Sequence, residues 1–258
     1  MSEHLLEFSD VSLSFKGVKA LVDISFTVDA HELFAIIGPN GAGKTSTFNC
    51  LNGVYKPQEG DIWWKGESII GWRPDKVADL GVARTFQNIE LFAHMTVIEN
   101  IELGRHIRTD VSWLAGAAWW GKAKKEEVAN RAMVEDIIDF LEIESWRHHP
   151  VGMLPYGIQK RVELGRALAM EPELLLLDEP VAGMNLEETE DMARFILDIR
   201  EELGIAMILV EHDMGLVMDI ADRVLVLDFG EVIAMGTPDV VQKDPNVIKA
   251  YLGEELDV

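Results

Sequence analysis

Three uninterrupted apolar runs stand out in the pattern of hydrophobic and polar positions. They are Leu33–Ile37, Leu174–Leu177 and Ala206–Val210. Short apolar runs of this kind, bounded by turn residues, are typical of strands buried on both faces of a parallel sheet. Each run is followed at once by glycine or by charged residues. In open α/β sheets, ligands bind beside the carboxyl ends of the strands, so the pattern predicts an α/β fold with a site along that edge.

A strict alternation of apolar and polar residues precedes the first run. Val11, Leu13 and Phe15 alternate in this way, as do Ile24, Phe26 and Val28. The alternation predicts two half-exposed antiparallel strands joined by a turn at 16–17, with Phe15 as an ordinary strand residue. Further short strands are predicted at 63–64, from 82, and in a hairpin around Gly230.

The middle of the chain has mainly helical periodicity. Thr96 and Glu99 form a capping-box pattern, and Val128, Ala132, Ile137 and Leu141 predict one apolar stripe on a later helix. Other helices are predicted at 74–81, 156–169, 192–203 and 245–253. We therefore expect a single domain over 1–258, in which the helical segment 88–169 is inserted between two parts of an α/β core, 1–87 and 170–258.

A phosphate-binding sequence follows the first buried strand. Its residues are Gly38, Pro39, Asn40, Gly41, Ala42, Gly43, Lys44, Thr45 and Ser46. The order fits G-x-x-x-x-G-K-[ST], in which glycines let main-chain N–H groups converge on phosphate oxygens. The lysine reaches the β- and γ-phosphates and the hydroxyl binds Mg²⁺. The sequence thus predicts a P-loop NTPase core that binds a nucleotide and Mg²⁺.

The other two buried strands end in residues with suitable chemistry for hydrolysis. Asp178 is placed to hold Mg²⁺, and Glu179 to orient or deprotonate an attacking water. His212 follows the third strand and lies at the same sheet edge. Gln87, taken alone, is typical of a surface glutamine.

Composition limits which cellular compartment and which kinds of partner fit the chain. With 23 basic and 45 acidic residues the formal net charge is −22, which disfavours nucleic acid and anionic lipid as partners. No apolar run approaches the roughly 20 residues of a membrane span, and the first residues lack the pattern of a signal peptide. The lone Cys50 allows no internal disulfide, in keeping with a reducing cytoplasm.

Taken in order, these motifs resemble those of the ATP-binding subunits of ABC transporters over nearly the full chain. Gln87 matches the Q-loop, Leu174–Glu179 the Walker B strand, Asn185 the D-loop and His212 the switch histidine. The signature position holds Leu154, Pro155, Tyr156, Gly157, Ile158 and Gln159. The resemblance implies that Phe15 stacks on adenine, that Thr45, Gln87 and Asp178 bind Mg²⁺, and that Glu179, His212 and Gln87 act in hydrolysis.

Finer features look like the subgroup that serves branched-chain amino-acid importers. The resemblance lies in the runs at 83–87, 156–157, 182–185, 210–214 and 250–253. The stretch from Trp113 to Trp120 looks like the longer of that subgroup's two ATPase subunits, and its rings either fill the helical core or form an interface. Related transporters carry urea, amides or aromatic acids, so the transported solute stays open.

The resemblance implies an antiparallel β subdomain, an inserted helical subdomain and a head-to-tail pair of ATPase subunits around two ATP molecules. The pair is a heterodimer or a homodimer. It is implied to act on two transmembrane permease subunits at the cytoplasmic face of the membrane, supplied by a periplasmic or extracellular solute-binding protein.

The chain departs from the common family pattern at two places, the signature, which reads Leu-Pro-Tyr-Gly-Ile in place of Leu-Ser-Gly-Gly-Gln, and the D-loop. Pro155 replaces a serine and so removes a hydroxyl and an N–H donor, and Asn185 replaces an aspartate. Three other classes of protein are alternatives. They are a soluble P-loop kinase, a non-transport ABC ATPase of DNA repair or translation, and a regulatory or assembly protein that uses ATP only as a ligand. The kinase does not explain the signature segment or His212.

Overall fold

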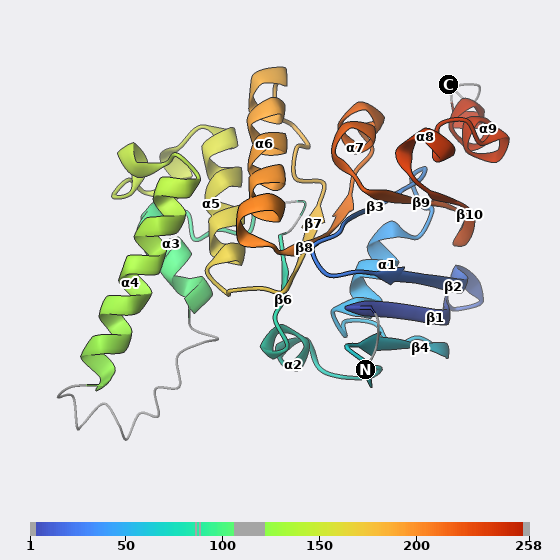
Figure 1. Cartoon of the computed structure of the whole chain (residues 1–258), viewed down its shortest axis with the longest axis horizontal. Coiled ribbons are helices and arrows are strands. Elements are labelled where there is room, and N and C mark those ends of the chain that lie inside the picture. Colours follow the sequence, from blue (N-terminus) through green and yellow to red (C-terminus); the bar gives the residue numbers. More distant parts are fainter. Residues whose placement is uncertain (1–3, 86, 88, 106–121, 255–258) are drawn as a thin grey trace.

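The computed structural model describes residues 4–85, 87, 89–105 and 122–254 and contains two β-sheets with helix α1 between them (Figure 1). The larger sheet has the order β10-β9-β3-β8-β7-β6, and the smaller has the order β2-β1-β4-β5. Strands β9, β3, β8, β7 and β6 pair in parallel, whereas β10 and all strands of the smaller sheet pair antiparallel. The predicted α/β fold class is confirmed.

The strands of the larger sheet are β3 (Leu33–Ile37), β6 (Val82–Arg84), β7 (Leu174–Asp178), β8 (Ala206–Val210), β9 (Arg223–Asp228) and β10 (Glu231–Gly236). Those of the smaller sheet are β1 (Leu6–Phe15), β2 (Val18–Val28), β4 (Glu59–Trp64) and β5 (Glu67–Ser68). The helices are α1 (Lys44–Leu51), α2 (Pro74–Asp79), α3 (Val97–Gly104), α4 (Lys122–Phe140), α5 (Tyr156–Leu168), α6 (Leu186–Leu203), α7 (Met214–Ile220), α8 (Pro238–Val241) and α9 (Pro245–Glu254), with short 3-10 turns at Glu144–Trp146 and Val151–Met153.

The three apolar runs form strands that are buried at every position, as predicted. Alternate residues of β3 enter two different cores. Leu33, Ala35 and Ile37 pack among the helices, whereas Phe34 and Ile36 pack against α1 and the smaller sheet. Because both faces of β3 are buried, the apolar side chains on each face are removed from water. This favours a position for the strand at the centre of the molecule.

Helices α3, α4 and α5 gather at the end of the molecule away from the smaller sheet (Figure 1). The capping box of Thr96 and Glu99 is confirmed at the start of α3. The predicted stripe on α4 is wrong in its first half. Val128 and Ala132 are exposed, and the buried residues are Val134, Ile137 and Ile138 within α4 and Leu141 just after it. The first half of α4 projects beyond α3 and α5 (Figure 1), in keeping with the exposure of Val128 and Ala132.

The interval from Trp113 to Trp120 lies outside the described residues. In the part of the chain that the structure covers, no helix combines the length and apolar character needed to cross a membrane.

Candidate functional site

The phosphate loop connects β3 to α1, and its glycines are required by the geometry. Gly38 has φ 147°, and a Cβ there would lie 2.1 Å from the carbonyl oxygen of Leu227. Gly43 has φ 110° and caps α1 in the left-handed region, which side chains rarely adopt. The loop therefore runs tightly against β9 and directs the positive end of α1 towards its own concave side.

Lys44 lies inside the curve of this loop. Its Nζ donates to the carbonyl oxygens of Gly38 at 2.5 Å and Pro39 at 3.0 Å, and the side chain is buried. Thr45 is exposed in the first turn of α1. The loop thus presents one fixed cation, main-chain N–H groups and a hydroxyl, which is the set of groups needed to bind phosphate oxygens.

Both predicted acids lie at the carboxyl end of β7. Asp178 is the last residue of the strand and accepts a hydrogen bond at Oδ2 from Arg84 Nη2 at 2.6 Å. Glu179 has φ 48°, a left-handed conformation that is uncommon for a residue with a side chain. Its Oε2 accepts from Gln87 Nε2 at 2.7 Å. The structure therefore brings Gln87 to the adjacent acids Asp178 and Glu179, from which it is distant in sequence.

His212 lies at the same sheet edge, just after the end of β8. Its Nδ1 lies 3.9 Å from Glu179 Oε2 and 3.7 Å from Glu211 Oε2, and its side chain is exposed. Glu211 is fully buried and accepts from the N–H groups of Val181 at 3.1 Å and His212 at 3.0 Å. Burial raises the pKa of Glu211. Glu211 thus ties the turn after Glu179 to the strand that carries the histidine.

The donor set at this edge fits a magnesium ion. Thr45 offers a hydroxyl oxygen and Asp178 a carboxylate. Gln87 donates to Glu179 through its amide nitrogen, which leaves its amide oxygen for a cation. Mg²⁺ prefers oxygen donors and keeps several waters and phosphate ligands. Among the described residues no group of three or more His, Cys, Asp or Glu forms an all-protein metal cage.

Phe15 lies at the end of β1 with 43% of its surface exposed. Its ring forms a T-shaped pair with that of Tyr55 at a centroid distance of 5.0 Å. Phe15 is therefore not a core residue, and it offers ring surface on which a base could stack.

The predicted signature segment opens helix α5. Pro155 is the N-cap residue and supplies no side-chain cap. The Tyr156 hydroxyl donates to the Ala182 carbonyl at 3.1 Å, and a Cβ on Gly157 would lie 2.5 Å from Glu188 Oε1. Asn185 caps α6 in a capping box with Glu188. The signature segment and the predicted D-loop are therefore held side by side.

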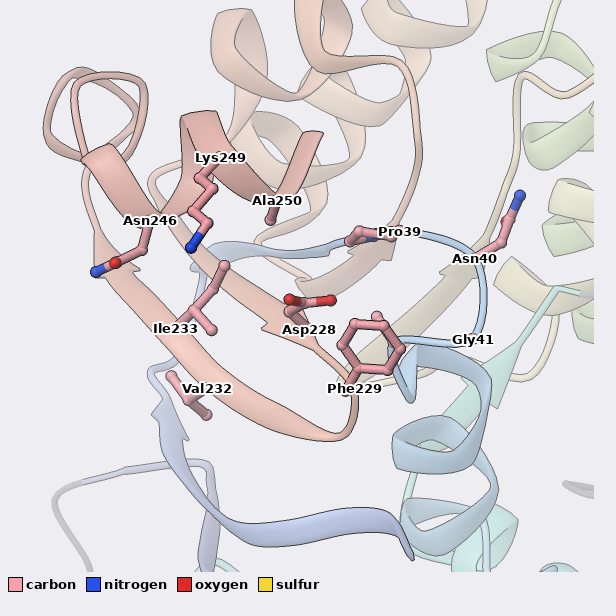
Figure 2. Close-up of a pocket in the computed structure, with 11 residues that line it drawn as sticks. Pro39, Asn40, Gly41, Asp228, Phe229, Val232, Ile233, Asn246, Lys249 and Ala250 are labelled. Atoms are coloured by element: carbon pink, nitrogen blue, oxygen red, sulfur yellow. The ribbon is translucent and has the colours of Figure 1, made fainter. Parts of the chain in front are cut away.

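A cavity of about 780 Å³ lies beside the phosphate loop (Figure 2). Its walls come from Pro39–Ala42, from the β9–β10 hairpin at Asp228, Phe229, Val232 and Ile233, and from α9 at Asn246, Lys249 and Ala250. The phosphate-loop residues Pro39–Ala42 line this cavity, whereas Lys44, Thr45 and Phe15 do not.

Three residues with clear structural roles at the site were not predicted from sequence. They are Arg84, which pairs with Asp178, Glu211, which anchors the Glu179 turn, and Lys160, which donates to the Gln87 carbonyl at 2.9 Å. Each is a charged residue that interrupts or ends an apolar pattern, and this is visible in the sequence. The residue with which it interacts, however, follows only from how the strands and helices pack in three dimensions.

Comparison with known proteins agrees with this geometry. A family model described as "ABC transporter" matches residues 21–182. The chain belongs to this ABC transporter family. A second model, "Branched-chain amino acid ATP-binding cassette transporter", matches residues 231–257 of the ABC subunit. The ABC subunit is therefore an ATP-binding protein and an ATPase of the P-loop class, as predicted.

Its relatives align with nearly the whole chain. The "High-affinity branched-chain amino acid transport ATP-binding protein BraF" of Pseudomonas aeruginosa is 39% identical and aligns with 98% of the ABC subunit and 100% of its own length. The protein LivG of Escherichia coli, described in the same words, is 38% identical with the same coverage. The ADP conformation of the ATP-binding cassette MJ1267 superposes with a TM-score of 0.84 at 29% identity, covering 98% of the ABC subunit and 100% of that chain. These relatives favour transport over the regulatory or assembly alternative.

Proposed function

We propose that this chain powers the import of branched-chain amino acids, or of a related small polar or carboxylate solute, by binding and hydrolysing ATP. Two observations support the solute class, namely the relatives named above and the match of residues 231–257 to a model of the branched-chain type. The observation that carries the hydrolytic role is the convergence of Gln87 and His212 on Glu179, beside Asp178.

In this proposal each side chain has one task. The loop 38–46 and Lys44 bind the phosphates, and Phe15 stacks on adenine. Thr45, Asp178 and the Gln87 amide oxygen hold Mg²⁺, which neutralises phosphate charge when bound. Glu179 accepts a proton from the attacking water, and His212 donates towards the terminal phosphate. The water attacks phosphorus, the bond to the leaving ADP oxygen breaks, and phosphate departs.

The assembly that we propose is a head-to-tail pair of ATPase subunits, more simply a heterodimer than a homodimer because Pro155 weakens the signature of this chain. The segments 154–159 and 182–185 then face the ATP of the second subunit. The helical segment 88–169 contacts two transmembrane permease subunits at the cytoplasmic face of the membrane, and a solute-binding protein delivers the solute from the other side.

The test is reconstitution. The ATPase pair is placed in proteoliposomes with its two membrane subunits, and ATP turnover is measured with the solute-binding protein loaded with leucine, isoleucine or valine, or with urea. We expect stimulation by at least one branched-chain amino acid. Turnover that is unaffected by the membrane subunits and by every loaded binding protein would contradict the transport function.

A further inference from the structure

Helix α5 contains a buried pair of opposite charges that the proposed chemistry does not use. Lys160 is 3% exposed and Glu163 is 2% exposed, and Lys160 Nζ lies 3.5 Å from Glu163 Oε2. Burying charged groups is costly unless they are paired and hydrogen-bonded, and apolar residues can often replace such a pair without loss of stability. A buried pair at this place is therefore poorly explained by stability alone.

The pair is connected to the hydrolytic edge through Gln87. Lys160 Nζ donates to the main-chain carbonyl of Gln87 at 2.9 Å, and the Gln87 side chain donates to Glu179 at 2.7 Å. An ammonium group has three donors, so it can hold the Gln87 carbonyl and the Glu163 carboxylate at once. Gln87 is thus fixed at one end to Glu179 and at the other to α5, whose first turn carries the signature residues.

We propose that Lys160 is a positioning residue that transmits the displacement of Gln87 to the signature end of α5. This inference rests on the proposed roles of Gln87 and Glu179. When ATP and a cation draw the Gln87 amide away from Glu179, the Gln87 peptide moves. The buried ammonium of Lys160 moves with the Gln87 carbonyl, because separating the two would break a hydrogen bond from a charged donor in a site with little water. Tyr156 and Gly157, one helical turn earlier, are displaced with it.

A neighbouring residue provides a matched control. Arg161 is the next residue of the same helix and also pairs with a carboxylate, but its partner is Asp191 on α6, and its guanidinium lies over the Phe195 ring at 4.9 Å. Arg161 therefore fastens α5 to α6 and not to Gln87. Substituting Arg161 disturbs the packing of α5 while leaving the Lys160 contact in place.

The experiment is amide hydrogen exchange on the full chain carrying Glu179→Gln, with and without ATP and Mg²⁺. In this parent we expect ATP to change exchange both in the peptide that carries Gln87 and in the peptide that carries Tyr156 and Gly157. Adding Lys160→Met with Glu163→Met removes both charges of the pair, so neither of the two is left buried without the other. This variant is expected to bind ATP within about twofold of the parent, to retain the response at Gln87 and to lose it at Tyr156.

Three comparisons complete the test. Lys160→Arg, which keeps the positive charge and N–H donors, is expected to retain the response at both peptides, and so is Arg161→Met. A full response at both peptides in the Lys160→Met and Glu163→Met variant would overturn the positioning role while leaving the proposed function intact. Absence of any ATP response in the parent would overturn the proposed function and the positioning role together.

Discussion

Arg84 Nη2 lies 2.6 Å from Oδ2 of Asp178, and both side chains are largely buried. Arg84 also donates to Asn49 Oδ1 at 2.8 Å and lies over the Phe48 ring at 5.4 Å. Asn49 and Phe48 belong to α1, the helix that starts with Lys44 and Thr45. Arg84 therefore fixes the carboxylate of Asp178 relative to the helix that completes the phosphate loop.

Removing Arg84 is expected to destabilise the fold. Breaking a buried ion pair by deleting one partner costs about 3–5 kcal/mol, because the other charge stays buried. Urea unfolding of Arg84→Met should show a loss of this order. Arg73→Met serves as the control, since Arg73 pairs with Asp75 in an exposed setting and such pairs are worth about 0–1 kcal/mol. Equal effects of the two substitutions would show that Arg84 does not stabilise Asp178.

Glu211 makes the free energy of unfolding of the chain depend on pH. Because burial raises the pKa of Glu211, the folded chain holds this proton more tightly than the unfolded chain does. The contribution of Glu211 to stability is then fully present below the ordinary glutamate pKa and is lost as pH rises through the raised pKa. The unfolding free energy of the wild type minus that of Glu211→Gln should decrease as pH rises above the ordinary glutamate pKa, and a constant difference would refute this account.

Lys44 is the fixed cation of the phosphate loop, and Lys44→Ala should weaken ATP binding or turnover by roughly ten- to a hundredfold, the range expected for lost hydrogen bonds to charged groups. Equilibrium binding and steady-state ATPase measurements test this. Lys76→Ala, which removes an exposed lysine paired with Asp79, should leave both unchanged. Wild-type binding and hydrolysis by a folded Lys44→Ala chain would show that the loop is not the ATP site.

Pro155 caps α5 without a side-chain hydrogen bond. Pro155→Ser adds a hydroxyl and an N–H at the predicted signature and also supplies an N-cap, worth about 1 kcal/mol. We expect ATPase activity to rise by about ten- to a hundredfold in the chain alone or in the assembled complex. Pro155→Ala restores the main-chain N–H without adding a hydroxyl. Comparing it with Pro155→Ser therefore separates the effect of the N–H from the effect of the hydroxyl. If Pro155→Ser changes activity in neither setting, the missing donor does not limit turnover.

The phosphate loop, the two acids and the buried strands were predictable because each is encoded within a short contiguous stretch. The partners of those residues were not. The Arg84–Asp178 pair depends on the register of β6 beside β7, and the Lys160–Gln87 contact depends on how α5 packs against the segment after β6. The exposure of Val128 was missed for a similar reason, since periodicity predicts a helical face but not how far the neighbouring helices extend.

Turnover by Glu179→Gln in the reconstituted transporter is the measurement that bears most directly on the account. The amide cannot accept a proton from water, whereas Lys44, Asp178 and the loop 38–46 are unchanged. ATP binding should therefore persist, hydrolysis should fall by roughly a hundredfold or more, and an ATP-bound dimer should accumulate. Hydrolysis at the wild-type rate, with normal coupling to solute uptake, would contradict the role of Glu179 and the mechanism built on it.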